Sequence, residues 1–267
     1  MSSLHRLEPG NVVSIGELST CGHDFCSDRK AAEKERKALR TEMFELQQRF
    51  YAAQDRKLLI VLQAMDAGGK DGSVRRVLEG IDPRGIRVNS FKLPTRQELA
   101  HDYLWRIHRE VPAAGMIGVF NRSHYEDVLA VRVRELVPEE VWQSRYQQIN
   151  QFESLLTETG TTILKFFLNI SKEEQKKRFQ SRLDVPEKNW KFSVEDLVTR
   201  ERWDDYMVAY EDMLNRCTTE AAPWYAIPAD QKWYRNLVIT RVIVDALKQI
   251  NPQYPPPAPG LDQVQIP

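Results

Sequence analysis

The chain has 267 residues, of which 42% are hydrophobic and 28% charged, a mixture typical of a soluble globular protein with one large α/β domain or two small ones. Its 38 Lys and Arg residues balance 38 Asp and Glu residues, so no overall basic field indicates a polyanion partner. The longest apolar runs are strand-sized and the first ten residues lack an apolar stretch, which argues against a membrane span or signal peptide. Three cysteines fit a reducing compartment, so we expect a cytoplasmic protein.

Residues 1–27 contain a fragment of a zinc-binding pattern in Cys21, His23 and Cys26. Structural zinc usually takes four ligands, and no second Cys or His pair lies nearby. We therefore interpret 1–27 as an irregular N-terminal extension without metal. A long charged helix is expected over 28–54, because apolar residues recur there at steps of three and four.

The next part of the chain alternates between predicted strands and helices. Strands are expected over 57–63, 86–92, 115–120, 161–170 and 224–229. Helices are expected over 70–81, 95–111, 138–159, 194–216 and 230–250, with a further helix after Ser171 that includes 176–183. Capping boxes are predicted at Thr95 with Glu98 and at Ser171 with Glu174.

Two segments have no repeating apolar pattern. Residues 184–193 are expected to be a mobile loop, and the proline-rich tail over 251–267 is expected to extend along a surface. Strands that alternate with helices of ten or more residues predict an α/β fold with a parallel sheet covered on both faces. No linker divides the chain, so we predict a single domain over 1–267.

The stretch LQAMDAGGKDGS, residues 62–73, lies between a predicted buried strand and a predicted helix. Such a glycine-rich turn exposes backbone N–H groups at the positive end of the following helix, where they can bind phosphate oxygens. Lys70 would add a full positive charge to this site. The match is incomplete, because Ala64 replaces the usual first glycine and the hydroxyl is displaced to Ser73. The alternative is a glycine-rich turn with a chance lysine. We predict phosphate or nucleotide contacts by Ala67, Gly68, Gly69, Asp71, Gly72, Ser73 and, at the tip of the third strand, Asn121.

Asp66 lies inside this loop, where its carboxylate would repel phosphate unless a divalent cation lay between them. Mg²⁺ prefers one or two carboxylates together with phosphates and water. We expect that Mn²⁺ could substitute for it. We expect Asp127 to supply the second carboxylate, with Glu126 either assisting or contacting the acceptor. Arg122 would reach into the same crevice beyond the strand ends. A structural salt bridge is its alternative role.

Basic residues cluster locally although the total charge cancels. Arg178 and Arg182 are four residues apart on one helical face. Others lie along the loop helix, after the second strand and after Asp127, namely Arg75, Arg76, Lys92, Arg132 and Arg134. Convergence of these side chains would suit a nucleic acid or a long phosphate chain. Few aromatic residues interleave with them and no recognition motif is present, which argues against nucleic acid.

Several blocks closely resemble the polyphosphate kinase 2 family of polyphosphate:nucleotide phosphotransferases. They span residues 28–255 and read LLIVLQAMDAGGKDGSVRRV, NSFKLPT, GVFNRSHYEDV, ILKFFLNISKEEQKKRFQSRL, KNWKFS and APWYAIPADQKWYRNL. The resemblance implies a P-loop kinase core with a central parallel sheet, a helical lid over about 178–193, Mg²⁺ and inorganic polyphosphate. It implies roles for the matching positions Asp66, Lys70, Lys92, Arg122, Arg178 and Arg182. Asn121 replaces an aspartate found in many members, as in the class that phosphorylates both AMP and ADP.

The expected reaction moves the terminal phosphate of polyphosphate to ADP, and to AMP, and is reversible. Asp66 and Asp127 would hold Mg²⁺, Lys70 and the loop would grip phosphates, and the arginines at 122, 178 and 182 would neutralise the transferring group. Arg75, Arg76, Lys92, Arg132 and Arg134 would bind polyphosphate, and the chain would form a dimer or tetramer without nucleic acid or membrane partners. The alternatives are an ATP-dependent nucleoside monophosphate kinase and a non-catalytic polyphosphate- or nucleotide-binding module.

Overall fold

A computed structural model describes residues 2–266 and contains one sheet of five strands. All neighbouring pairs are parallel, and the order β2-β3-β1-β4-β5 puts β1 in the centre. The strands are β1 (Lys57–Gln63), β2 (Ile86–Ser90), β3 (Ile117–Asn121), β4 (Thr161–Asn169) and β5 (Trp224–Pro228). The predicted α/β fold with a parallel sheet is confirmed.

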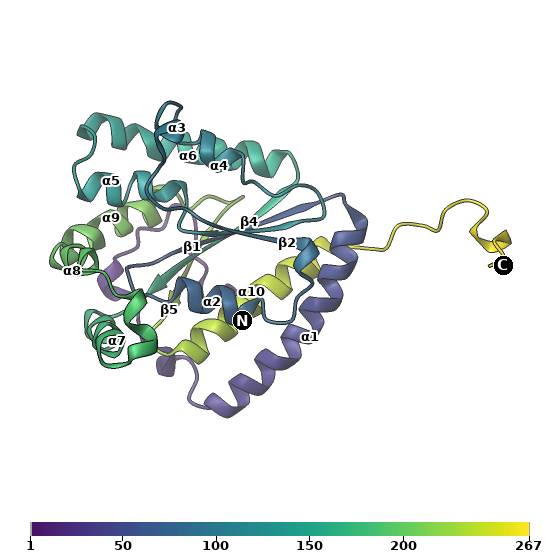
Figure 1. Ribbon diagram of the computed structural model, residues 1–267, viewed down its shortest axis with the longest axis horizontal. Helices are drawn as coiled ribbons and strands as arrows, with labels where there is room; N and C mark the ends of the chain where they lie inside the picture. The colour runs from purple at the N-terminus through teal and green to yellow at the C-terminus, as the bar shows by residue number, and fades with distance from the viewer. Residues whose placement is uncertain (1, 267) are drawn as a thin grey trace.

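Helices cover both faces of the sheet (Figure 1). One face carries α1 (Arg29–Ala53), α2 (Lys70–Val77) and α10 (Lys232–Ile250). The other face carries α6 (Glu139–Glu158), α9 (Trp203–Arg216) and the short helices α3 (Arg96–Leu99), α4 (Trp105–His108) and α5 (Ala130–Val133). Because both faces are covered, β1 reads as a nearly continuous apolar run, and all its residues after Lys57 are buried. No helix among residues 2–266 is long and apolar enough to cross a membrane.

The long first helix follows its predicted boundaries closely. Asp28 caps its start by accepting a hydrogen bond from the Ala31 backbone N–H at 2.9 Å. Gln54 ends it in the left-handed region with φ of 52°. The buried residues Met43 and Phe50 belong to the predicted apolar stripe, which packs α1 against α10.

The predicted helix over 95–111 is wrong as a single element. Thr95 and Glu98 form the expected capping box, but the helix ends at Leu99 and a second one begins at Trp105. Between them, the Asp102 carboxylate accepts a hydrogen bond from the Leu104 N–H at 3.0 Å. Such a local bond competes with the helical pattern and favours a turn.

Other boundaries differ for similar local reasons. The predicted helix over 194–216 is divided into α8 (Glu195–Glu201) and α9 at Arg202, whose φ and ψ are −92° and 29°. Helix α2 ends at Val77 rather than 81, shortly before Gly80, which has a left-handed φ of 83°. Helix α7 (Lys172–Asp184) is followed by a 3-10 helix, Pro186–Lys191, within the segment expected to be a loop.

The N-terminal residues lie along the outer edge of β5, and we call residues 4–25 the N-terminal strap. Arg6 forms an antiparallel bridge with Tyr225, and the Leu7 N–H donates to the Trp224 carbonyl at 2.8 Å. The strap contains 3-10 turns but no α-helix or strand, as expected for an irregular segment. It covers a sheet edge that would otherwise expose unpaired backbone groups.

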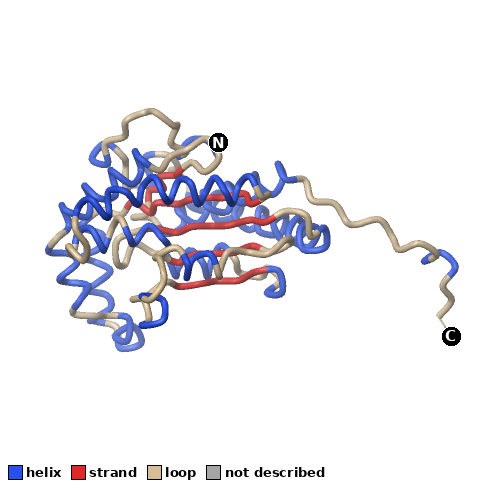
Figure 2. Tube along the Cα trace, turned by 90° about the horizontal axis from the view of Figure 1, so that it is seen from above, coloured by secondary structure: helices blue, strands red, loops and turns tan. Residues whose placement is uncertain are grey.

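The proline-rich tail leaves the body after Pro252, which is buried. Residues 253–261 are exposed, and the tail extends away from the molecule on the side opposite α7 and α8 (Figures 1 and 2). The expectation that it runs along a surface is therefore wrong. Three consecutive prolines, 255–257, favour an extended backbone that needs no sheet or helix partner.

Candidate active site

The glycine-rich loop connects the end of β1 to the start of α2. Ala67 and Gly69 both have left-handed backbones, with φ of 58° and 109°. A side chain at position 69 would collide with the guanidinium of Arg235, so glycine is required there on two grounds. The resulting turn exposes backbone N–H groups at the positive end of α2, which is the arrangement that binds phosphate oxygens.

Lys70 is the first residue of α2, and its ammonium folds back onto the loop. The Nζ atom donates to the carbonyl oxygens of Ala64 at 2.6 Å and Met65 at 3.3 Å. Burial, together with the nearby positive charge of Arg122, lowers its pKa to about 8. A phosphate bound in the loop would favour the charged form.

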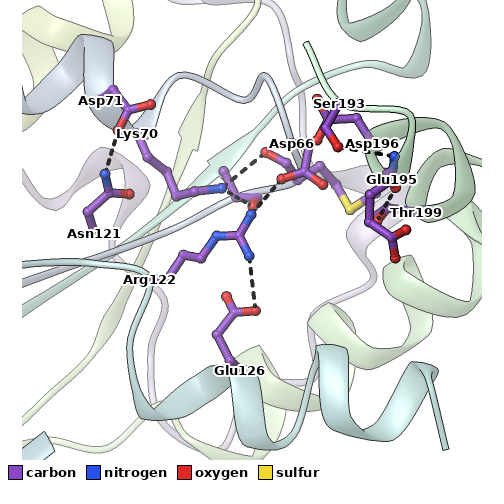
Figure 3. Close-up of polar contacts among 12 residues, drawn as sticks. Asp66, Lys70, Asp71, Asn121, Arg122, Glu126, Ser193, Glu195, Asp196 and Thr199 are labelled. Carbon is purple, nitrogen blue, oxygen red and sulfur yellow. Dashed lines mark hydrogen bonds and ion pairs between the residues drawn. The ribbon is translucent and has the colours of Figure 1, made fainter. Parts of the chain in front are cut away.

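Asp66, Arg122 and Glu126 meet at the carboxyl ends of β1 and β3 (Figure 3). Arg122 Nη2 donates to Asp66 Oδ1 at 2.8 Å, and its Nη1 lies 3.8 Å from Glu126 Oε2. Gln63 Nε2 donates to Glu126 Oε1 at 3.1 Å. Attraction to Glu126 raises the pKa of Arg122 despite burial. The structure thus brings together three predicted catalytic residues, with the carboxylates of Asp66 and Glu126 on either side of the Arg122 guanidinium.

Asp127 was expected to hold a metal ion together with Asp66, but its carboxylate is paired with Arg145 instead. Its carboxylate accepts a hydrogen bond from Arg145 Nη1 at 3.0 Å, and both side chains are nearly buried. Burial raises the pKa of Asp127 to about 6, and Arg145 opposes that shift. The structure therefore does not place Asp127 with Asp66, whereas its neighbour Glu126 shares Arg122 with Asp66.

Asn121 and Ser73 were expected to contact phosphate or nucleotide. Asn121 Nδ2 donates to Asp71 Oδ1 at 2.6 Å, which links the tip of β3 to the first turn of α2 (Figure 3). Ser73 is only 1% exposed and lines a small cavity with the apolar side chains Ile60 and Val77. A phosphate contact by Ser73 does not fit this position, because its hydroxyl lies on the buried face of α2.

Arg178 connects the loop to the end of β5. Its Nη1 donates to the carbonyl oxygens of Ala67 at 2.9 Å and Gly68 at 3.1 Å. Its Nη2 donates to those of Ala229 at 2.7 Å and Asp230 at 3.0 Å. With its guanidinium bonded in this way, Arg178 fixes the shape of the phosphate loop and brings a positive charge beside it.

The N-terminal strap supports the same part of the site. Thr20 Oγ1 donates to Asp230 Oδ2 at 2.9 Å, and the Ser171 N–H at the start of α7 donates to Asp230 Oδ1 at 2.8 Å. The strap therefore fixes Asp230, whose backbone holds Arg178. The sequence predicts residues 1–27 only as an irregular extension, because nothing in their pattern indicates which strand they cover.

Arg182 of α7 and Asp196 of α8 form an ion pair. Arg182 Nη1 lies 3.0 Å from Asp196 Oδ2 and also donates to the Lys191 carbonyl at 3.0 Å. Burial raises the pKa of Asp196, and the negative charge of Asp66 raises it further. Asp196 lies near Asp66 in Figure 3. Asp196 was not among the predicted site residues.

Arg235 is a second residue that sequence reasoning missed. It is 1% exposed and lies beneath the loop, where Nη1 donates to the Gly68 carbonyl at 3.2 Å. Burial, together with repulsion from Arg178, lowers its pKa to about 9. Among residues 2–266 it has no carboxylate within ion-pair distance, so its charge adds to the positive potential of the loop. Its place in the apolar helix α10 gave no signal in the sequence.

The five residues expected to bind polyphosphate fall into three groups. Arg75 and Lys92 are exposed and form no ion pair within the described chain. Arg76 lies 3.6 Å from Glu79, and Arg134 lies 2.9 Å from Glu195 of α8. Arg132 is paired with Asp212 at 2.6 Å and stacks over Trp142 in a separate groove beside α9. Arg132 thus lies in a different part of the surface from the loop.

A parallel sheet with a glycine-lysine loop after its central strand, and with acidic and basic side chains at the neighbouring strand end, defines a P-loop type of phosphotransferase. The sequence profile of the Polyphosphate kinase 2 (PPK2) family matches residues 26–255. The chain belongs to the polyphosphate kinase 2 family, which confirms the resemblance seen in the sequence.

Individual relatives agree with this assignment. The chain is 52% identical over 242 residues to the AMP/ADP-polyphosphate phosphotransferase of Meiothermus ruber, covering 91% of each chain. It is 45% identical over 270 residues to the ADP-polyphosphate phosphotransferase of Rhodopseudomonas palustris, covering 96% of this chain and 92% of the relative. The crystal structure of Polyphosphate Kinase 2 from Arthrobacter aurescens TC1 superposes with a TM-score of 0.92 at 42% identity, covering 96% of this chain and 92% of that one. Phosphotransferases of this family usually need a divalent metal ion.

Proposed function

We propose that this protein transfers the terminal phosphate of inorganic polyphosphate to ADP and to AMP, and that the reaction is reversible. The observation that carries the proposal is the convergence of Asp66 and Glu126 on Arg122, beside the loop that begins α2. The names of the relatives from Meiothermus ruber and Rhodopseudomonas palustris support the two acceptors. In each transfer the P–O bond to the terminal phosphate of the polymer breaks, and an oxygen of the terminal nucleotide phosphate forms the new bond.

The cation we propose is Mg²⁺, with Mn²⁺ as a substitute. Asp66 and Glu126 offer hard oxygen donors, and the described residues contain no cluster of three or more acidic, His or Cys side chains able to hold a metal. Such a set fits Mg²⁺, which takes one or two carboxylates and completes its shell with phosphate oxygens and water. When bound, the ion would supply positive charge to the transferring phosphate. We infer that Glu126 rather than Asp127 is the second carboxylate, because Asp127 is hydrogen-bonded to Arg145.

The protein itself contributes position and charge, since phosphoryl transfer needs little covalent participation by the enzyme. Lys70 and the backbone N–H groups of the loop hold phosphates at the start of α2. Asp66 and Glu126, which pair with Arg122 in the structure, would hold the cation, and the Arg122 guanidinium beside them would bind the transferring phosphate. Arg178 and the buried Arg235 keep the loop in shape and add positive potential behind it.

We further propose that residues 178–193 form a lid over this crevice. In the present arrangement, Arg182 is bonded to Asp196 and to the Lys191 carbonyl, so the lid is held by contacts within itself and with α8. Phosphates would draw Arg182 inward, and closure would exclude water and limit hydrolysis.

A cytoplasmic location and a dimeric or tetrameric state remain predictions, and light scattering of the purified protein tests the oligomeric state.

The decisive assay supplies polyphosphate, Mg²⁺ and either ADP or AMP, without ATP. We expect ATP from ADP, and ADP followed by ATP from AMP. A Lys70→Met variant provides the matched control for contaminating activity. Phosphorylation of AMP that requires ATP and ignores polyphosphate would instead support a nucleoside monophosphate kinase. Binding without any transfer would support a non-catalytic module.

A further inference from the structure

A buried ionic network lies directly behind the turn that carries Arg122 and Glu126. Lys165 on β4 donates from Nζ to Glu153 Oε2 at 2.6 Å, to the Tyr125 hydroxyl at 2.9 Å and to the Cys217 carbonyl at 2.6 Å. Glu153 on α6 accepts a further hydrogen bond from the Tyr125 hydroxyl at 2.8 Å, and its Oε1 lies 3.2 Å from His124 Nε2. All three donor positions of the ammonium are used.

The charges of this network are fully removed from water. The side chains of Lys165 and His124 are 0% exposed and that of Glu153 is 2% exposed. Burial raises the pKa of Glu153, but Lys165 and His124 outweigh this and hold the carboxyl below its ordinary value. Burying an ion pair costs several kcal/mol per ion, and an apolar pair of similar volume is often equally stable. The fold by itself does not require charges here.

The position of the network in the chain links it to the site. His124 and Tyr125 lie between Arg122 and Glu126 and begin the 3-10 turn His124–Asp127. Arg122 has a left-handed backbone with φ of 62°, a conformation that costs about 1–3 kcal/mol and has to be held by its surroundings. The side chains of His124 and Tyr125 point into the network, whereas Arg122 contacts Asp66 and Glu126 contacts Gln63 at the carboxyl ends of β1 and β3.

We propose that Glu153 and Lys165 are positioning residues of the phosphotransfer site. Their ion pair holds His124 and Tyr125, and thereby fixes the turn from which Arg122 and Glu126 reach the reacting phosphates. This inference rests on the proposed function. A displacement of about 1 Å in such groups is enough to lower a rate about a hundredfold, so a small rotation of the turn would matter more for turnover than for folding.

The first test is Glu153→Gln, which keeps the shape of the side chain and removes its charge. We expect kcat per folded molecule to fall at least about tenfold, while KM for polyphosphate and for nucleotide changes little. The double variant Glu153→Met with Lys165→Met replaces the pair by apolar side chains and is expected to recover stability without recovering kcat. Leu247→Ala, a buried change on α10, is the control for lost stability alone and should leave kcat per folded molecule unchanged.

A double-mutant cycle shows whether Glu153 acts through Arg122. In an Arg122→Ala background, Glu153→Gln should lower kcat little further, because the group it positions is gone. If the losses of kcat caused by Glu153→Gln and Arg122→Ala multiply in the double variant, the proposal is overturned. An unchanged kcat in Glu153→Gln alone would also overturn it, and the network would then be a structural feature only.

Amide hydrogen exchange gives a readout that does not depend on the reaction. In Glu153→Gln, residues 122–127 should exchange faster, with 64–69 unchanged. Unchanged exchange over 122–127 would also contradict the inference. Failure of wild-type protein to use polyphosphate would overturn the proposed function instead, and the exchange result would still stand.

Discussion

The ammonium group of Lys70 loses its proton near pH 8, within the range of ordinary binding experiments. Burial lowers its pKa from 10.5 to about 8, so the free protein loses this charge well before an ordinary lysine does. Between these two values the unfolded chain binds the extra proton, and the Lys70 contribution to stability therefore increases as pH rises. Phosphate binding has the opposite dependence, because the bound phosphate needs the ammonium.

We therefore predict that affinity for polyphosphate or nucleotide weakens as pH rises above about 8, by up to about tenfold per pH unit. Binding titrations of wild-type protein and of Lys70→Met measure this. The variant should bind more weakly and show a flatter profile. Identical profiles for the two proteins would mean that Lys70 does not hold the phosphates.

Glu126 and Asp127 are adjacent in sequence but are expected to differ in role. If Glu126 is the second cation ligand, as we propose, Glu126→Gln should lower kcat by about 10²–10³ and raise the Mg²⁺ concentration needed for half activity. Asp127→Asn should leave kcat within about tenfold of wild type, since asparagine can still accept the hydrogen bond from Arg145. Metal titrations of both variants decide between them. If the Mg²⁺ concentration needed for half activity rises in Asp127→Asn but not in Glu126→Gln, Asp127 rather than Glu126 is the second ligand.

Asp127 also makes a prediction about stability. Its pKa is raised from 3.8 to about 6, so the folded protein binds this proton more tightly than the unfolded chain does. The contribution of this group to stability is therefore present below about pH 4 and is lost as pH rises through about 6. Asp127→Asn should be more stable relative to wild type at pH 7 than at pH 4. Urea unfolding at both values measures the difference, and a constant difference would contradict the shift.

At the scale of elements, α7 and the 3-10 helix Pro186–Lys191 have few buried residues. Only Gln175 and Phe179 are buried in α7 and none in the 3-10 helix, where Trp190 is 78% exposed. A segment with so little buried apolar surface opens at low free-energy cost. Arg182 donates to the Lys191 carbonyl and pairs with Asp196, and these contacts connect the 3-10 helix to α7 and α7 to α8.

We predict that amide exchange over 185–193 is fast in the free protein and slows when polyphosphate and nucleotide are bound together. Residues 237–247 in the buried helix α10 provide the internal control. Arg182→Ala should lower turnover more than it weakens nucleotide binding. Slow exchange in the free protein, unchanged by ligands, would show that the segment is a fixed wall.

At the scale of the whole molecule, the formal net charge is zero, and attraction of a polyanion depends on which basic groups lack acidic partners. Arg75 and Lys92 are exposed with no ion pair in the described part of the chain, whereas Arg132 is paired with Asp212. Polyphosphate affinity should therefore fall steeply with salt, as for other polyanions that release counterions.

Replacing Arg75 or Lys92 by Gln should reduce the slope of log affinity against log salt by about one each. Arg132→Gln should leave the slope unchanged, since its charge is already neutralised by Asp212. Titrations of polyphosphate at several salt concentrations test all three. A reduced slope in Arg132→Gln would show that the polymer reaches the groove beside α9.

The sequence by itself determined the features that depend on neighbouring residues. The apolar run over 57–63 predicted the central strand, because a strand buried on both faces needs consecutive apolar residues. Gly68 and Gly69 with Lys70 predicted the glycine-rich loop, since Gly69 has a left-handed backbone and a side chain at 68 would collide with Ala64. The family resemblance was equally readable, since its blocks are contiguous. The break of the helix over 95–111 was missed, because a local bond of Asp102 overrode a helical pattern.

Only the tertiary structure decided which distant side chains meet. Sheet order and helix packing brought Arg235 beneath the loop, separated Asp127 from Asp66 by giving it Arg145, and joined Glu153 and Lys165 behind the turn at 122–127. Each of these contacts joins different elements of the fold. Their energies depend on burial and distance, and neither quantity exists until the sheet and its covering helices have assembled.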